Sequence, residues 1–171
     1  MIDRVLIDTL ELKSRDFAIR WKDALCDNPQ FGNYNKMDEK SLIEMNMKMY
    51  PLLSRSLDRG FDHAQIEHIF VKLGKDRMHS GFSISEVILA LNLVQKIVIE
   101  YIMTEFAPEN PVRMYQSMGA LTKLSEFFLM GSFYIFRGFL EEIYTSMNIK
   151  DKISEDLLKK YFRDDFFFKQ G

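Results

Sequence analysis

The 171-residue sequence contains a single cysteine, Cys26, so no internal disulfide bond can stabilise the fold. This scarcity suits a reducing compartment, and we expect the protein to be cytoplasmic. Residues 1–16 include acidic side chains and no long apolar core, which argues against a signal peptide. Glycine-rich phosphate-binding loops and the GxSxG pattern of serine hydrolases are also missing. The sequence therefore gives little support for an enzyme of a common class.

An excess of charge of one sign is also lacking. Lysine and arginine contribute 23 residues, aspartate and glutamate contribute 25, and the net charge is -2. No basic field would attract nucleic acid, so we expect no nucleic-acid partner. By contrast, methionine and phenylalanine are abundant, with 11 and 15 residues. They either fill gaps in a helical core or line an adaptable apolar pocket or interface.

Histidine is scarce, with 3 residues, which limits metal and haem chemistry. His63 and His68 are five positions apart and point to different sides of a helix, so the HExxH zinc pattern is absent. Haem needs one proximal histidine, and this alternative stays open although no histidine lies in an apolar helical stripe. His79 is a candidate for phosphotransfer, but its neighbours include no companion catalytic residues. We expect no cofactor, no metal site and no enzymatic activity.

Residues 73–106 organise the expected fold, because they hold a helix end, a turn and a long apolar helix. Gly74 and Gly81 bracket the polar sequence KDRMHS, which predicts that one helix ends here in a turn. Ser83 is followed three residues later by Glu86, which predicts a capping box at the start of the next helix.

The helix that follows is apolar on most of its circumference from residue 87 to residue 103, so it should lie at the centre of the core. Lys96 and Glu100 interrupt the apolar run well short of the ~20 residues that cross a bilayer. We therefore expect no membrane span.

Helical spacing and turn residues divide the chain before this stretch. A helix is predicted over residues 3–25 and a loop over 27–37. The next helix should start near Asp38, with Ser41 as a competing cap, and Pro51 should kink or divide it. A further helix should open at Asp62.

Beyond the central helix, Asn110 and Pro111 predict the cap and first position of another helix. A continuous helix from residue 112 to about 147 would be about 54 Å long at ~1.5 Å per residue, unless glycines bend or divide it. Residues 127–140 carry one charge, Arg137, and form either a second central helix or a dimer surface. Together these patterns predict an all-α fold: one domain over residues 1–171, an antiparallel bundle of about five to six helices with two long central helices.

Two arginines stand out because of where they lie. Arg77 is in the predicted turn and Arg137 is in the apolar stretch. Such a charge usually pairs with an acid or reaches water, and its functional alternative is to anchor an acidic ligand head group or a partner carboxylate. The candidate ligand or partner contacts are Arg77, His79, Phe133, Arg137, Phe166 and Phe167, the last two from a terminal run of three phenylalanines.

Two segments, SRDFAIRWKDAL at residues 14–25 and FVKLGKDRMHSGFSISEVILALNLVQKIV at residues 70–98, carry a family resemblance. They resemble the N-terminal sensor domains of bacterial Rsb-type stress-signalling co-antagonists, the RsbRD N-terminal family. The resemblance implies an all-helical, non-enzymatic domain that receives signals upstream of a STAS or histidine-kinase output domain. After residue 150 the chain shows neither STAS-like strand–helix alternation nor an ATP-binding motif, so a stand-alone sensor domain is expected.

Two functions remain in contention. The first is a regulatory helical module that acts through protein contacts, as a homodimer or with a signalling partner that carries a STAS or kinase domain. The second is a sensor of a small apolar ligand, such as a fatty acid or haem, in a pocket lined by methionine and phenylalanine. A pocket between the two central helices with one polar group would favour the second, and an exposed phenylalanine patch over a well-packed core would favour the first.

Overall fold

A computed structural model describes residues 4–26, 28–107 and 110–146 of the chain, and within these ranges every regular element is helical. The predicted all-α bundle is confirmed. The elements are α1 (Arg4–Leu12), α2 (Ser14–Leu25), η1 (Pro29–Phe31), η2 (Tyr34–Lys36), α3 (Glu39–Met47), α4 (Met49–Arg59), α5 (His63–His79), α6 (Ile84–Tyr101), η3 (Ile102–Phe106) and α7 (Pro111–Ser146).

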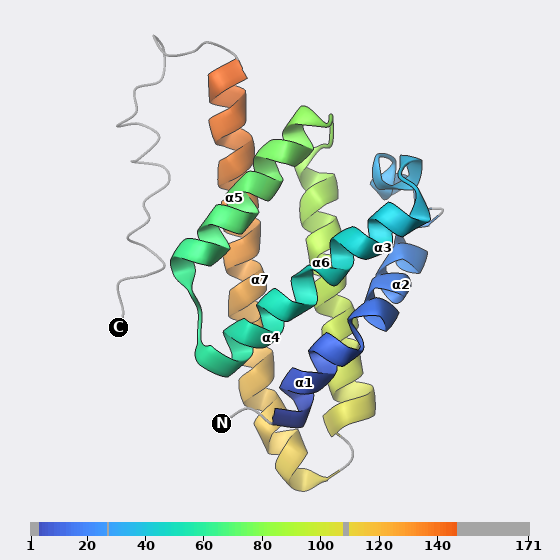
Figure 1. Cartoon of the computed structure of the whole chain (residues 1–171), viewed down its shortest axis with the longest axis vertical. Coiled ribbons are helices and arrows are strands. Elements are labelled where there is room, and N and C mark those ends of the chain that lie inside the picture. The colour runs from blue at the N-terminus through green and yellow to red at the C-terminus, as the bar shows by residue number, and fades with distance from the viewer. Residues whose placement is uncertain (1–3, 27, 108–109, 147–171) are drawn as a thin grey trace.

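Two long helices form the centre of the bundle, as the sequence predicts. Helix α7 is continuous over 36 residues and runs the length of the molecule beside α6 (Figure 1). Its glycines do not divide it. The backbone N–H of Arg113 donates to Asn110 Oδ1 at 2.8 Å, which confirms the predicted cap before Pro111. Helices α1 and α2 form one row and α3 and α4 a second, and α5 packs on α7.

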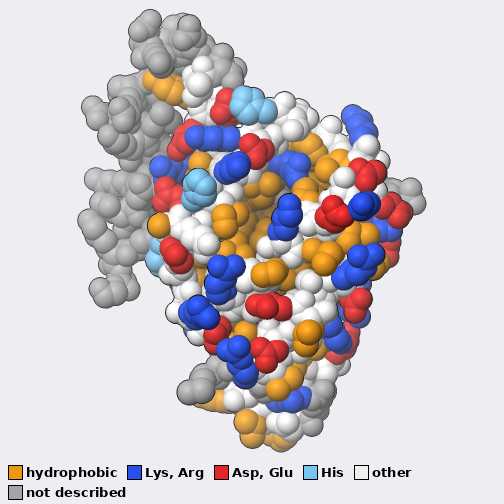
Figure 2. Space-filling model, in the orientation of Figure 1, with side chains coloured by type: hydrophobic (Ala, Val, Ile, Leu, Met, Phe, Trp, Pro, Cys, Tyr) orange, Lys and Arg blue, Asp and Glu red, His pale blue; other side chains and the backbone are white. Residues whose placement is uncertain are grey.

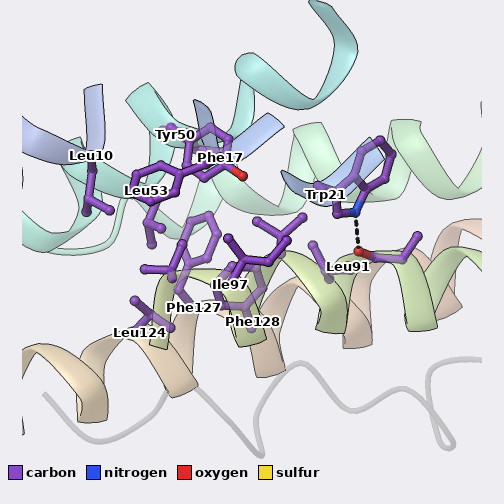
Figure 3. Close-up of a cluster of buried hydrophobic side chains, with 14 of the residues drawn as sticks. Leu10, Phe17, Trp21, Tyr50, Leu53, Leu91, Ile97, Leu124, Phe127 and Phe128 are labelled. Atoms are coloured by element: carbon purple, nitrogen blue, oxygen red, sulfur yellow. Dashed lines mark hydrogen bonds between the residues drawn. The ribbon is translucent and has the colours of Figure 1, made fainter. Parts of the chain in front are cut away.

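The core lies where the two rows of short helices meet α6 and α7 (Figure 3). Trp21 on α2 is 2% exposed, and its Nε1–H donates to the carbonyl of Ala90 on α6 at 2.9 Å. This hydrogen bond satisfies the indole inside an apolar core, so Trp21 anchors α2 to α6. Residues from five helices pack there with it: Leu10, Phe17, Tyr50, Leu53, Leu91, Ile97, Leu124, Phe127 and Phe128.

The first helices are shorter than expected. The predicted helix over residues 3–25 is divided at Lys13 into α1 and α2. Pro51 divides the next predicted helix, since α4 starts only two residues before it and Pro51 then lies in a first turn, where its missing N–H leaves no helical bond unmade. Asp38 Oδ1 accepts from the N–H of Ser41 at 2.9 Å, so Asp38 is the cap and Ser41 is not.

The expected turn at KDRMHS is wrong, because α5 continues through it to His79. Gly74 lies inside the helix, and it is needed there because a Cβ at this position would overlap the backbone of Ile135 on α7. A Cβ on Gly138 would likewise overlap the backbone of Val71 on α5. The two helices therefore touch backbone to backbone at this crossing, which only glycine permits at both positions.

The end of α5 is a Schellman motif. Gly81 has a φ of 79°, its N–H donates to the carbonyl of Met78 at 3.0 Å, and the N–H of Phe82 donates to the carbonyl of Arg77 at 3.0 Å. The helix therefore ends beside Gly81, at the end of the KDRMHS sequence, and not at its start, where the predicted turn would end it.

Helix α6 continues into the π-helical turn η3, and by length and composition alone Ile84–Phe106 meets the criterion for a membrane-crossing helix. The sequence argument that Lys96 and Glu100 exclude such a span was therefore too strict. In the structure this helix packs on α2 and α7, and the central helix of a helical bundle meets the same criterion. The absence of a membrane span stays a prediction.

Candidate functional site

The candidate site surrounds Arg77, in the last turn of α5. The guanidinium lies 4.9 Å from the ring centre of Phe82 and 5.5 Å from that of Tyr34, within the range of cation–π contacts. One terminal nitrogen contacts the sulfur of Met45 on α3. The Nε atom is buried, and no hydrogen-bond partner for it exists among the described residues. Arg77 is therefore held by aromatic rings and a thioether instead of a carboxylate.

Local backbone geometry places these groups together. The Schellman motif turns the chain at Gly81, so that Phe82 returns toward Arg77. Tyr34 comes from η2 in the preceding loop, and its ring lies 4.8 Å from that of Phe82 and 5.6 Å from that of Trp21. The site is thus built from the start of α6, the end of α5, α3 and the loop.

Glu86 is 4% exposed and secures the loop from α6. Its Oε1 accepts from the N–H of Asn33 at 2.7 Å and of Tyr34 at 3.2 Å, and its Oε2 accepts from Asn33 Nδ2 at 2.8 Å. The expected capping box is therefore only half confirmed. Ser83 Oγ accepts from the N–H of Glu86 at 3.2 Å, but the carboxylate bonds to the loop and not to the N–H of Ser83.

The phenol of Tyr34 is kept neutral by its surroundings. Tyr34 is 3% exposed, and burial raises its pKa to about 12. The positive charge of Arg77 lowers this pKa, and the negative charge of Glu86 raises it. The site therefore presents one cation, a neutral phenol and an apolar wall to any ligand that reaches Arg77.

Two further buried polar atoms are without a hydrogen-bond partner among the described residues: Asn46 Oδ1 on α3 and the hydroxyl of Tyr50 on α4. Tyr50 is 0% exposed, and burial raises the pKa of its phenol. An unmade hydrogen bond of this kind costs about 1–3 kcal/mol, and bound water or ligand often supplies it. With Arg77 Nε, these atoms come from three successive helices.

The surface is hollowed between α5 and the row formed by α3 and α4. Figure 2 shows apolar side chains in this depression and basic side chains at its edge. Met45 and Met49 on the row, and Leu73 on α5, are partly buried apolar residues that pack against the core. Apolar and cationic groups are therefore available on the same side of the molecule.

Arg137, the second candidate arginine, lies in a different environment. Its Nε donates to Glu141 Oε1 at 2.9 Å, and a terminal nitrogen donates to Glu67 Oε1 at 3.0 Å. Lys75 also pairs with Glu141 at 2.7 Å. Burial raises the pKa of Glu141, but the hydrogen bonds from Lys75 and Arg137 outweigh it, so that the pKa is lowered. Arg137 is thus paired with acids, the usual role of such a charge.

An open depression of about 540 Å³ lies on the α5–α7 side near Arg137. Its lining includes Lys72 and Lys75 together with Glu67 and Glu141, so charges of both signs neighbour one another. His79 lies near the end of the same helix pair, where Nε2 is 2.9 Å from Glu142 Oε1 and the side chain is 64% exposed. Among the described residues, the structure thus places His79 beside one carboxylate at the surface.

The phenylalanine candidates are only partly described. Phe133 is partly buried and packs on Tyr134 with ring centres 5.3 Å apart, whereas Phe136 is 41% exposed. Phe166 and Phe167 lie outside the described residues. Sequence reasoning missed an exposed apolar face on α7, although helical spacing could have found it. Its members are Met114, Tyr115, Met118, Leu129 and Phe136.

Metal chemistry gains no support from the described part of the chain, where no group of three or more histidine, cysteine and acidic side chains could hold an ion. His63, His68 and His79 are all exposed, which also weakens the haem alternative.

The model of the family described as histidine kinase N terminal matches residues 3–141, which include α1 to α6 and most of α7. The chain belongs to the histidine kinase N-terminal family. This family is a sensor-domain family of bacterial signalling, so the resemblance to a signalling sensor domain holds at that level. The match does not support the narrower RsbRD assignment. No curated protein and no solved structure matches the chain significantly.

Proposed function

We propose that this histidine kinase N-terminal domain is a non-enzymatic cytoplasmic sensor that binds a small apolar molecule through an acidic head group at Arg77. The observation that carries the proposal is the state of Arg77: half-buried, with an unpartnered Nε and no ion pair to a carboxylate among the described residues. A buried charge without a counter-charge is costly, and a ligand carboxylate would supply both the charge and the missing acceptor.

The chemistry of the surroundings supports an apolar ligand body. Met45 contacts Arg77, aromatic rings cover the guanidinium, and the nearby depression contains apolar side chains (Figure 2). Ligand sites commonly combine an apolar lining with a few polar groups that fix orientation. The site lies among α3, α5 and the loop, and not between the two central helices, where a pocket was expected to favour this function.

The output of the sensor, in this proposal, is protein contact through the exposed apolar face of α7. Tyr115 and Met118 are 79% and 66% exposed, and Leu129 is 56% exposed. A second copy of the chain that covered this face would form a homodimer, and a histidine-kinase-type signalling protein would be the downstream partner. That residues 1–171 form a single domain also stays a prediction.

Ligand binding tests the input half. Laurate, which has an apolar chain and one carboxylate, should bind the full chain far more tightly than dodecanol, which has the chain without the charge. Arg77→Met should weaken laurate binding by about 10-fold or more, the loss expected for a charged contact. Arg137→Met is the matched control, because that arginine is already neutralised by acids. Calorimetry that found equal laurate affinity in wild type and Arg77→Met would contradict the proposal.

Sedimentation at micromolar concentration tests the output half. We expect a dimer that Phe136→Glu dissociates, because a charge is placed on the exposed face. The control is Glu126→Gln, on an exposed position of the same helix, which should leave the dimer intact. A monomer at all concentrations would remove the dimer from the proposal and leave the ligand site unaffected.

A further inference from the structure

The Arg77 site has two parts outside the α-helices, the loop of residues 28–37 and Phe82 in the turn between α5 and α6. The loop is braced internally by Asn28, whose side chain accepts from the N–H of Gln30 at 3.0 Å and whose carbonyl accepts from Asn35 Nδ2 at 3.1 Å. Such bracing lets the segment move as a unit.

Two kinds of contact join the loop to the helices: the rings of Phe31 and Tyr34 are buried in the core, and Glu86 supplies hydrogen bonds. The carboxylate accepts from two backbone N–H groups and one side-chain amide of Asn33 and Tyr34, and charge-assisted bonds of this kind are the stronger ones. Asn33 Nδ2 reaches one further acceptor, the carbonyl of Gly81, at 3.4 Å. One side chain on α6 thus accepts three hydrogen bonds from the loop.

The same arrangement decides the state of Arg77. Tyr34, which Glu86 fixes through its backbone, lies against the guanidinium. Glu86 is the buried acid nearest in sequence to Arg77, yet its oxygens are taken by the loop donors and no ion pair joins it to Arg77 among the described residues. Closure of the loop therefore both covers Arg77 and leaves it without an acidic partner.

We propose that residues 28–37 are a movable cover over Arg77 and that Glu86 is the positioning residue that holds the cover closed. The inference rests on the proposed function, since the cover regulates entry and release of the acidic ligand. Opening requires that the hydrogen bonds of Asn33 and Tyr34 are exchanged for water and that the buried rings of Phe31 and Tyr34 leave the core, but no α-helix has to break. When the cover is open, the carboxylate of Glu86 is also free of the loop. The ligand and the loop therefore compete, because each of them changes the surroundings of Arg77 and Glu86.

Asn33→Asp is the test variant, because it replaces a donor with a carboxylate that faces Glu86. Asn35→Asp is the matched control, with the same change on the same loop at an exposed residue that bonds only within the loop. Trp21 is the single tryptophan of the chain and its ring contacts Tyr34, so its fluorescence reports the position of the loop.

Stopped-flow measurement of laurate binding to the full chain gives the first readout. With Asn33→Asp, association and release should both become about 10-fold faster than in wild type and Asn35→Asp, since a looser cover opens more often. A defect in packing alone would speed release without speeding association. Equal association rates in Asn33→Asp and Asn35→Asp would overturn the proposal.

Hydrogen exchange without ligand gives an independent readout. The amides of residues 33 and 34 should exchange about 10-fold faster in Asn33→Asp, while those in the middle of α6 stay unchanged. If laurate binds no variant, the ligand assignment fails, and hydrogen exchange alone tests whether residues 28–37 are a movable cover. Unchanged exchange at residue 34 would refute it. Should Asn33→Asp not fold, Glu86→Gln, which keeps the size and removes the charge, is read out in the same two ways.

Discussion

Two arginines of similar burial face opposite situations in this molecule. Arg137 lies on the α5–α7 side between Glu67 and Glu141, and each of these carboxylates accepts a hydrogen bond from it. Arg77, on the same α5 helix that supplies Glu67, is surrounded by two rings and a methionine and has no carboxylate partner in the described chain. The comparison separates an arginine that is paired with acids from one that has no acidic partner among the described residues.

The regions also differ in how their backbones are joined. At the α5–α7 crossing two glycines allow direct backbone contact, so the helices are fixed to each other by shape. At the Arg77 site a loop is held by hydrogen bonds to one carboxylate. The first region should therefore respond to mutation with large losses of stability, and the second with changes in binding.

The largest effect is expected at the crossing. Gly138→Val should lower the free energy of unfolding by about 3 kcal/mol or more, because the new side chain overlaps the backbone of Val71. Gly119→Ala on the same helix meets no atom within 4 Å and should be neutral or stabilising by about 0.5–1 kcal/mol. Urea unfolding measures both. A small loss in Gly138→Val would show that the two backbones are not in contact.

An intermediate effect separates the two arginines. Arg137→Met leaves two half-exposed carboxylates near each other and should cost about 1–2 kcal/mol of unfolding free energy. Arg77→Met removes a cation that has no counter-charge. It should therefore lower the unfolding free energy by less than about 0.5 kcal/mol, or raise it. The same urea series decides. A larger loss in Arg77→Met than in Arg137→Met would reverse the comparison.

The smallest effect is the pH dependence of the paired region. The pKa of Glu141 is lower in the folded chain than the usual value of about 4.3, so its ionised form stabilises the fold above that pH. This contribution is lost as the pH falls through the lowered pKa. The stability difference between wild type and Glu141→Gln should therefore shrink below about pH 4. A difference that stays constant from neutral pH to pH 3 would contradict this.

Local signals made the helix starts predictable. Four side chains each accept a hydrogen bond from the backbone N–H three residues later, and each is visible as a cap in the sequence: Asp38, Asp62, Ser83 and Asn110. The all-α class and the continuous α7 follow from the same periodicity. Such features depend on neighbours in the chain, which a single sequence displays.

Contacts between distant positions account for the failures. Gly74 resembles a helix end, but its reason is the backbone of α7, some 60 residues further along the chain. Glu86 resembles the second half of a capping box, but its partners are in a loop 53 and 52 residues earlier. Arg77 stood out as an unusual charge, whereas Tyr34, which covers it, carried no signal of its own.

The continuity of α7 has a mechanical meaning. The backbone contacts at Ile135 and Gly138 hold the helix to α5 at one crossing, and Gly138 lies 27 positions after Pro111. At ~1.5 Å per residue this arm is about 40 Å long, so a tilt of a few degrees at the crossing displaces its far end by roughly 2–4 Å. The far end carries Tyr115 and Met118, two exposed apolar side chains. Because Leu124, Phe127 and Phe128 on this arm are buried in the core, such a tilt would shift core side chains together with the exposed far end of the helix.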